Sequence, residues 1–236
     1  MLTLALLAGG MATRLRPITE QIPKSLVELH GQPFIAHQLR LLESNGIRRV
    51  VVCVGFLGEM IRQVIGNGQK FGVQVEYSFD GETLLGTAGA IKRALPFLGD
   101  AFFVLYGDSY LACDYMSVEG HFRHSGKLAL MTVFRNEGKW DSSNVEFENG
   151  GIRAYSKKNR TPRMHYIDYG LGVFSAKAFE HIPAGEPYDL AELYCKILES
   201  GQLAGMEVHH RFYEIGSPEG LQETADFLAR ERVKHG

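Results

Sequence analysis

The sequence predicts an α/β fold, a Rossmann-like doubly wound sheet that is mixed but mainly parallel and carries a small antiparallel insertion. Two observations support this prediction. Buried-type apolar runs alternate with segments of helical periodicity through the first 135 residues, as expected of βαβ units. From Asn144 onward the pattern changes to short alternating strands, the first two of which are separated by Gly150-Gly151, which indicates antiparallel pairing.

The first half supplies the parallel part of the sheet. The run at 48–56 is rich in β-branched valine and apolar after its two arginines, as in a central strand that is covered on both faces. The segment 33–45 places apolar residues at helical spacing, with Pro33 suited to a first turn and Gly46 to a C-terminal cap. By the same criteria, the expected strands are 2–7, 48–56, 73–79 and 101–109, and the expected helices are 33–45, 58–65 and 87–95.

The second half is expected to continue this sheet and to add the antiparallel insertion. Ser217, followed by Pro218 and Glu219, is a strong signal for the start of the last helix. The sequence contains no internal repeat and no long linker, so one compact domain over 1–236 is expected. The expected helices are 114–124, 175–181, 189–200 and 217–234, and the expected strands are 128–134, 144–149, 151–156, 165–174 and 211–216.

Composition excludes several classes of protein. Hydrophobic residues make up 45% of the chain and the formal net charge is −2, so no overall field favours nucleic acid or an acidic membrane as a partner. No apolar run approaches the roughly 18 residues of a membrane helix. The three cysteines lack a CxxC spacing and the nine histidines lack a zinc-site spacing. A cytoplasmic location is therefore expected.

The loop after the first strand is the strongest functional signal. In "LALLAGGMATRLRPITEQIPKSLVEL", residues 4–29, Gly9 and Gly10 directly follow an apolar run, so their backbone N–H groups can approach phosphate oxygens closely. A glycine pair alone is more often a simple turn. Here Arg14, Arg16 and Lys24 lie in the same loop, and cationic donors of this kind suit a polyphosphate.

A second signal lies at the end of a later strand. Gly107 and Asp108 follow the buried run "FFVLY". Ligands of doubly wound sheets bind beyond the carboxyl ends of the strands, so these residues are expected close to the glycine loop. A carboxylate there could hold a cation that bridges phosphates.

These motifs resemble the signature of sugar-1-phosphate nucleotidyltransferases, roughly L-A-G-G-x-G-T-R-L-x-P-x-T-x-x-x-P-K-x-L. Further segments match in the same order as in that family, namely "LLGTAGAI" (84–91), "VLYGDSY" (104–110) and "FYEIGSPEGL" (212–221). The resemblance covers essentially the whole chain. The compact length is most similar to that of bacterial members that activate heptose, mannose or N-acetylmuramic acid 1-phosphates by guanylyl or uridylyl transfer, without the β-helix that some relatives add.

The resemblance implies a role for particular residues, beginning with Arg14, Lys24 and Asp108 in catalysis. Mg²⁺ would be held by Asp108 and Glu214. The implied nucleotide-binding residues are Leu7, Ala8, Gly9, Gly10, Met11, Ala12, Thr13, Arg14, Gly86, Thr87, Ala88 and Gly89. The implied substrate-binding residues are Gly107, Lys157, Asp168 and Gly170, with Lys158 as a rival to Lys157.

The chain departs from the family pattern at three of these positions. Ala12 replaces a glycine, Ser156 replaces a glutamate before Lys157, and Glu214 replaces the second metal-binding aspartate.

The resemblance also implies a reaction and an organisation. The sugar 1-phosphate would attack the α-phosphorus of a nucleoside triphosphate, with GTP favoured, and release pyrophosphate. A phosphate monoester is largely dianionic at pH 7 because its second pKa is about 6, so no general base is needed. A nucleotide-binding half would span about 1–135, a sugar-phosphate half about 140–216, and a C-terminal helix 217–234. The base, the sugar and whether the chain forms a homo-oligomer stay open.

Two alternatives are compatible with the same sequence. One is a cytidylyltransferase for phosphocholine or a phosphonate, in which Tyr166, Tyr169 and Asp168 would surround the substrate cation. The other is a regulatory subunit that binds nucleotide or sugar nucleotide without turnover, an interpretation supported by Ala12 and Glu214.

Overall fold

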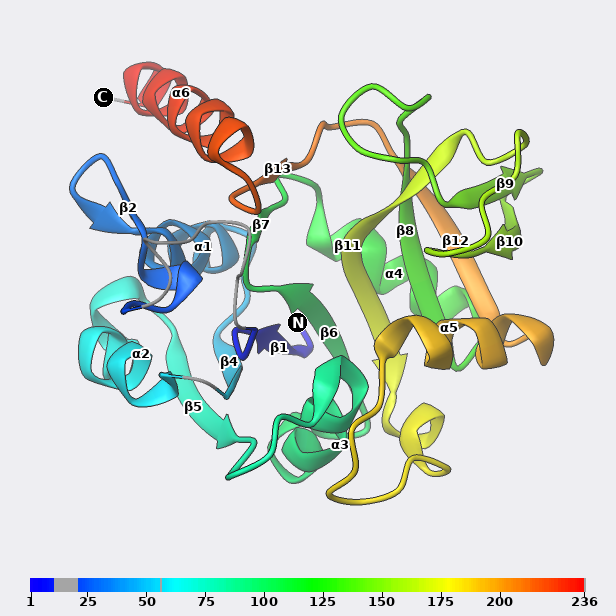
Figure 1. Cartoon of the computed structure of the whole chain (residues 1–236), viewed down its shortest axis with the longest axis horizontal. Coiled ribbons are helices and arrows are strands. Elements are labelled where there is room, and N and C mark those ends of the chain that lie inside the picture. Colours follow the sequence, from blue (N-terminus) through cyan, green and yellow to red (C-terminus); the bar gives the residue numbers. More distant parts are fainter. Residues whose placement is uncertain (11–20, 56, 236) are drawn as a thin grey trace.

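The computed structural model describes residues 1–10, 21–55 and 57–235, with side chains to residue 231. Nine strands of this part of the chain form one sheet, in which hydrogen-bonded neighbours follow the spatial order β10-β9-β11-β6-β1-β4-β5, with β8 beside β11 and β12 beside β8 (Figure 1). The strands are β1 Thr3–Leu7, β4 Arg49–Val54, β5 Gln74–Phe79, β6 Ala101–Tyr106, β8 Ala129–Arg135, β9 Val145–Glu148, β10 Gly151–Tyr155, β11 Tyr166–Ser175 and β12 Leu203–Val208.

Strands β1, β4, β5 and β6 are parallel, and the chain order reverses between β1 and β6. β1 pairs with β4 on one side and with β6 on the other, so its carboxyl end lies between theirs. In a doubly wound sheet this reversal is the place where ligands bind. The fold class predicted from the sequence is confirmed.

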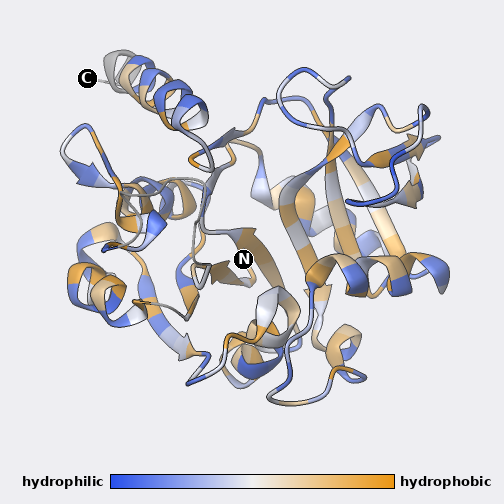
Figure 2. Cartoon of the chain, in the orientation of Figure 1, coloured by the Kyte–Doolittle hydropathy of each residue, from blue (hydrophilic) through white to orange (hydrophobic). Residues whose placement is uncertain are grey.

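Helices cover both faces of the sheet, because alternate residues of each strand face opposite sides. Leu4 and Leu6 of β1 belong to a core shared with α1, α2 and α4, whereas Ala5 faces a second core shared with α3 and α5. Figure 2 shows hydrophobic residues gathered on the central strands and on the inner sides of the helices. The helices are α1 Phe34–Ser44, α2 Gly58–Ile65, α3 Gly86–Leu98, α4 Tyr115–Ser125, α5 Leu190–Glu199 and α6 Pro218–His235.

Helix ends follow the capping signals in the sequence. The Asp114 carboxylate accepts hydrogen bonds from the Ser117 hydroxyl and from the Ser117 and Met116 N–H groups at the start of α4, which together lower its pKa. The Ser217 hydroxyl likewise accepts from the Gly220 N–H in the first turn of α6. No helix in the described part of the chain combines the length and apolarity needed to cross a lipid bilayer.

The second half differs from the expectation in two respects. The strand expected at 165–174 is not confined to an antiparallel insertion, because β11 pairs with β6 and β8 in the middle of the sheet. The strand expected at 211–216 is only the short β13, Tyr213–Glu214, which pairs with β7, Ser109–Tyr110, outside the main sheet. β12 was not predicted at all.

Smaller elements complete the chain. A short hairpin joins β2, Glu28–Leu29, and β3, Gln32–Pro33, just before α1. The helix expected at 175–181 is a 3₁₀ turn, η5 Ala176–Phe179. Two further 3₁₀ turns are η3 Lys24–Leu26 and η4 Gln69–Phe71.

Candidate active site

A cavity of about 420 Å³ opens at the carboxyl ends of β1, β4, β5 and β6. It lies at the reversal of strand order, as the fold predicts. Its lining brings together segments that are far apart in the sequence. The lining residues are Leu7, Ala8, Gly9, Gly10, Lys24, Ser25, Cys53, Asp80, Leu84, Gly86, Thr87, Ala90, Tyr106, Gly107, Asp108 and Gly216.

The floor of the cavity is formed by backbone at the ends of β1 and β6. The Gly107 N–H donates to the Leu7 carbonyl oxygen over 2.9 Å, and a Cβ at Gly107 would lie only 2.5 Å from that oxygen. Gly107 therefore permits a contact that any other residue would block. Gly10 also lines the cavity, and among the residues that the structure describes no atom lies within 4 Å of a Cβ added to it. The expected proximity of the two loops is confirmed.

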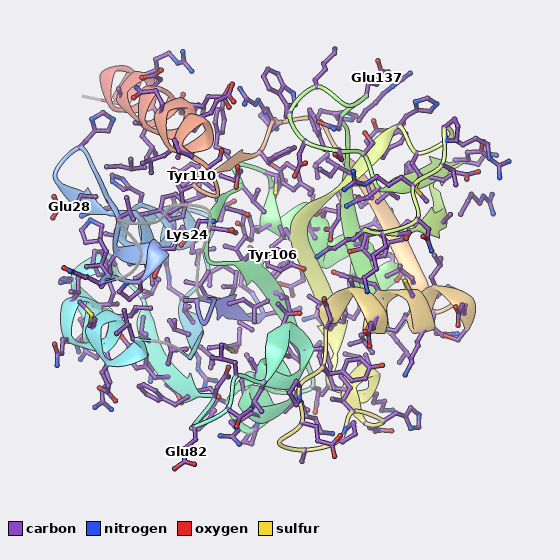
Figure 3. All side chains as sticks on the ribbon, viewed as in Figure 1. Lys24, Glu28, Glu82, Tyr106, Tyr110 and Glu137 are labelled. Atoms are coloured by element: carbon purple, nitrogen blue, oxygen red, sulfur yellow. The ribbon has the colours of Figure 1, made fainter. Side chains whose placement is uncertain are left out.

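Lys24 and Asp108 form an ion pair at this floor. Lys24 Nζ lies 2.8 Å from Asp108 Oδ2, with side-chain exposures of 15% and 33%. Pro23 and η3 position the lysine, and Asp108 follows directly after the end of β6 and Gly107. In Figure 3 the labelled Lys24 and Tyr106 lie near the centre of the molecule. The sequence predicted a role for both charged groups, and the structure places them in contact.

Glu214 lies next to Asp108 because the two segments are hydrogen-bonded through their backbones, but its carboxylate accepts a hydrogen bond from the Gly216 N–H. β13 pairs Glu214 with Ser109, and the Ile215 N–H donates to the Asp108 carbonyl over 2.9 Å. Glu214 Oε2 accepts from the Gly216 N–H at 2.7 Å. The Glu214 side chain lines a second, polar cavity of about 200 Å³, which also includes Arg211.

The oxygen donors of Asp108 and Glu214 fit the chemistry of Mg²⁺, which commonly takes one or two protein carboxylates together with substrate phosphates. Within the described residues no three His, Cys, Asp or Glu side chains gather as a complete metal cage. A Mg²⁺ ion held by these two carboxylates would share its coordination shell with water and substrate phosphate oxygens.

The "GTAG" segment opens α3, and only its first half faces the cavity. Gly86, with φ +68°, and Thr87 line the cavity, while the N–H groups of Ala88 and Gly89 donate to the Tyr188 carbonyl oxygen. The Thr87 hydroxyl accepts from the Leu190 N–H at 2.7 Å. The segment is thus held by the loop that precedes α5.

Of the residues expected to bind the sugar phosphate, Gly107 lines the cavity, whereas Lys157, Asp168 and Gly170 lie beside it. Lys157 Nζ lies 5.5 Å from the centre of the Tyr106 ring. Asp168 accepts from the Gly170 N–H at 3.1 Å and from the Tyr155 hydroxyl at 3.5 Å. Burial raises the pKa of Asp168, and the charge of Lys157 opposes that rise. Tyr106, which does line the cavity, connects the two groups of residues.

Gly170 lies where the register between β11 and β8 shifts, and its φ of +97° favours glycine. The shift lets β11 bend as it passes the site. Lys158, the rival of Lys157, is exposed, and its backbone N–H donates to the Ser156 hydroxyl.

Four expected site residues, Met11, Ala12, Thr13 and Arg14, lie outside the described residues, as does Arg16. Sequence reasoning also missed several cavity residues. Cys53 and Asp80 lie at the carboxyl ends of β4 and β5. The rule that ligands bind beyond the carboxyl ends of parallel strands, which predicted a role for Asp108, could also have predicted one for these two residues. Ser25 follows Lys24 directly. The residues missed are Ser25, Cys53, Asp80, Leu84, Ala90, Tyr106 and Gly216.

Two of these missed residues present unused hydroxyl groups. Ser25 Oγ and the Tyr106 hydroxyl are buried and have no hydrogen-bond partner in the described part of the chain. Buried polar groups normally have partners, so these two are candidates for contact with a ligand.

The tyrosines proposed to surround a choline cation do not form a cage. Tyr169 is 2% exposed and packs against Phe134 and Phe212 in the core. Tyr166 packs edge-on against Phe147. The structure therefore gives no support to the phosphocholine alternative.

Comparisons with known proteins agree with this geometry. The model of the nucleotidyl transferase family matches residues 5–231. A UTP–glucose-1-phosphate uridylyltransferase from Synechocystis is 31% identical over 96% of this chain and 63% of its own length. The catalytic subunit beta of mannose-1-phosphate guanylyltransferase from Xenopus tropicalis is 30% identical over 98% of this chain and 66% of its own. The chain thus spans slightly less than two thirds of these relatives.

A solved structure extends the similarity to the fold. A Bacillus anthracis protein that carries the name of a glucose-1-phosphate thymidylyltransferase superposes with a TM-score of 0.84 at 25% identity. The match covers 98% of this chain and 96% of that one. The relatives are named for different bases and for different sugars.

Proposed function

The chain belongs to the nucleotidyl transferase family, and we propose that it transfers a nucleoside monophosphate, with GTP as the favoured donor, to a sugar 1-phosphate. The ion pair of Lys24 with Asp108 on a glycine-lined cavity floor is the observation that supports this most directly. Both substrates are polyanions, so the site must bring negative charges together. A cation beside open backbone N–H groups suits that task.

The reaction needs few groups that transfer protons. A phosphate oxygen of the sugar 1-phosphate attacks the α-phosphorus of the nucleotide, and the bond from that phosphorus to the bridging oxygen breaks. Pyrophosphate leaves, and a nucleoside diphosphate sugar remains. The attacking group is already largely ionised at pH 7 because its second pKa is about 6. Positioning and charge stabilisation are then the main contributions of the protein.

Each half of the site has a task in this proposal. Gly9, Gly10 and Arg14 bind the triphosphate, and Lys24 stabilises the charge at the α-phosphate during the displacement. Asp108 and Glu214 would hold Mg²⁺, which when bound neutralises phosphate charge. On the other side of Tyr106, Lys157 binds the sugar phosphate, and Asp168 with Gly170 contacts the sugar. Gly107 lets substrate approach the backbone between the two halves.

The Asp108→Asn variant tests this assignment. We expect pyrophosphate release with Mg²⁺, GTP and a hexose 1-phosphate to fall by about 10²-fold or more, the scale for loss of a major electrostatic contribution to catalysis. Thermal unfolding should change little, because Asp108 is partly exposed. Asp100→Asn, at the opposite end of β6 and exposed, is the matched control. Near-normal turnover of Asp108→Asn would rule out its role.

A further inference from the structure

Asp80 lies at the end of the cavity that is farthest along the sheet from Asp108. It follows β5 directly, while Asp108 follows β6, and β4 and β1 lie between these strands. Neighbouring strands are about 4.8 Å apart, so three strand intervals separate the two positions by about 14 Å. That span suits an extended nucleotide with its phosphates over β1 and β6 and its base toward β5.

The carboxylate of Asp80 is held in place by a hydrogen bond, but not all of its acceptor positions are occupied. Asp80 is 7% exposed and lines the cavity with Leu84 and Gly86. Its Oδ2 accepts from the Leu85 N–H at 3.1 Å, and its carbonyl accepts from Arg93 Nη1 at 2.7 Å. No hydrogen bond to Oδ1 occurs among residues 1–10, 21–55 and 57–235. A carboxylate has about four acceptor positions, so Asp80 retains capacity for a ligand.

Because the Asp80 carboxylate is buried, a hydrogen-bond donor on a ligand would stabilise its ionised form. Burial raises the pKa of Asp80, while the Leu85 N–H and the charge of Arg93 partly offset that rise. A buried carboxylate that has lost water gains most from donors that replace it. Two N–H groups from one ligand would supply them together.

We propose that Asp80 selects guanine by accepting hydrogen bonds from its N1–H and 2-amino groups. An ionised carboxylate is an acceptor only. Guanine presents two adjacent donors on its Watson–Crick edge, whereas adenine and cytosine present an amino group beside a ring acceptor, and uracil and thymine present one N–H between two carbonyl groups. Each of the other bases would place an acceptor atom opposite one carboxylate oxygen, where the two lone pairs repel. Guanine alone offers a donor to both oxygens. This inference rests on the proposed nucleotidyl transfer and names the feature that chooses its nucleotide.

Inosine triphosphate provides the sharpest probe, because it differs from GTP only by lacking the 2-amino group. The wild-type protein should prefer GTP over inosine triphosphate by about 10- to 100-fold in kcat/KM, the scale for one hydrogen bond to a charged group. In Asp80→Asn the preference should fall close to one. Glu82→Gln should keep it, since Glu82 is exposed and points outward at the edge of the molecule in Figure 3.

Equilibrium binding of the same two nucleotides without sugar phosphate separates this inference from the proposed function. Preferential GTP binding without turnover would sustain the role of Asp80 while opposing nucleotidyl transfer. Turnover of UTP or CTP in preference to GTP would sustain transfer and overturn the role of Asp80. Equal binding of GTP and inosine triphosphate by the wild-type protein would also overturn it, and this result needs no variant to fold.

Discussion

At the scale of single residues, the site depends on charges that are held in fixed contact before any substrate arrives. Lys24 is 15% exposed and Asp108 33% exposed, and each lies on a different segment fixed by local backbone structure. Preorganisation of this kind reduces the reorganisation that charge development would otherwise require. Lys157 is positioned differently, over the ring of Tyr106, on the side where the second substrate is expected.

The neighbouring lysines 157 and 158 allow a matched comparison. Lys157→Met should raise the KM for the sugar 1-phosphate by about 10-fold or more, because it removes a charge-assisted contact to phosphate. Lys158→Met should have a much smaller effect, because it is Lys157 that lies over the ring of Tyr106, a residue of the cavity lining. Steady-state kinetics at saturating nucleotide would measure both. A larger effect from Lys158→Met would reassign the phosphate contact.

Substitution of Asp168 by asparagine should increase stability and decrease activity. Because its pKa is raised in the folded protein, the ionised form is less favourable there than in the unfolded chain. That penalty is absent well below the unfolded pKa of about 3.9, where the carboxyl is protonated in both states; it grows as the pH rises from the unfolded pKa toward the folded pKa and is complete above the folded pKa. Asp168→Asn should therefore increase the unfolding free energy at pH 7 but not at pH 3, while weakening use of the sugar 1-phosphate.

Denaturant unfolding at the two pH values measures the effect of Asp168→Asn on stability. The exposed carboxylate of Asp100 gives the control variant, Asp100→Asn. A variant that is stabilised equally at both pH values would show that desolvation of the Asp168 carboxylate is not the cause.

At the scale of elements, sequence patterns predicted the strands whose residues are strongly apolar and missed those shaped by packing. β4 is recognisable because four of its six residues are valine, which is β-branched. β12 contains glycine and methionine instead, and an added Cβ at Gly205 would lie 2.7 Å from the Phe147 ring. The glycine that weakens the strand signal is required by contact with β9, and such a contact cannot be read from local sequence.

Two glycines in different elements should respond oppositely to the same substitution. Gly107→Ala should destabilise the protein by about 1–3 kcal/mol, because the new methyl group overlaps the Leu7 carbonyl oxygen. Gly120→Ala, inside α4 with no atom of the described residues outside the helix backbone within 4 Å of the added Cβ, should stabilise it by about 0.5–1 kcal/mol. Urea unfolding would measure both. A neutral Gly107→Ala would show that the β1 and β6 ends are less closely packed than described.

At the scale of the whole molecule, the order of strands assembles the site. Residues 7–10, 53, 80 and 106–108 come together because β1, β4, β5 and β6 are parallel neighbours whose carboxyl ends share one edge. The rule that ligands bind beyond the carboxyl ends of parallel strands could therefore predict that the first loop and Asp108 lie close together. It could not show that Glu214 turns its carboxylate toward Gly216, or that Ala88 and Gly89 are held by Tyr188, because both depend on how distant loops pack.

Pyrophosphate release across a substrate panel tests nucleotidyl transfer most directly. The purified protein with Mg²⁺ would be given each ribonucleoside triphosphate and dTTP, crossed with sugar 1-phosphates and phosphocholine, and the products identified by mass spectrometry. We expect release with GTP and a sugar 1-phosphate, together with a matching nucleoside diphosphate sugar. Nucleotide binding without release in any combination would contradict nucleotidyl transfer and favour a regulatory protein.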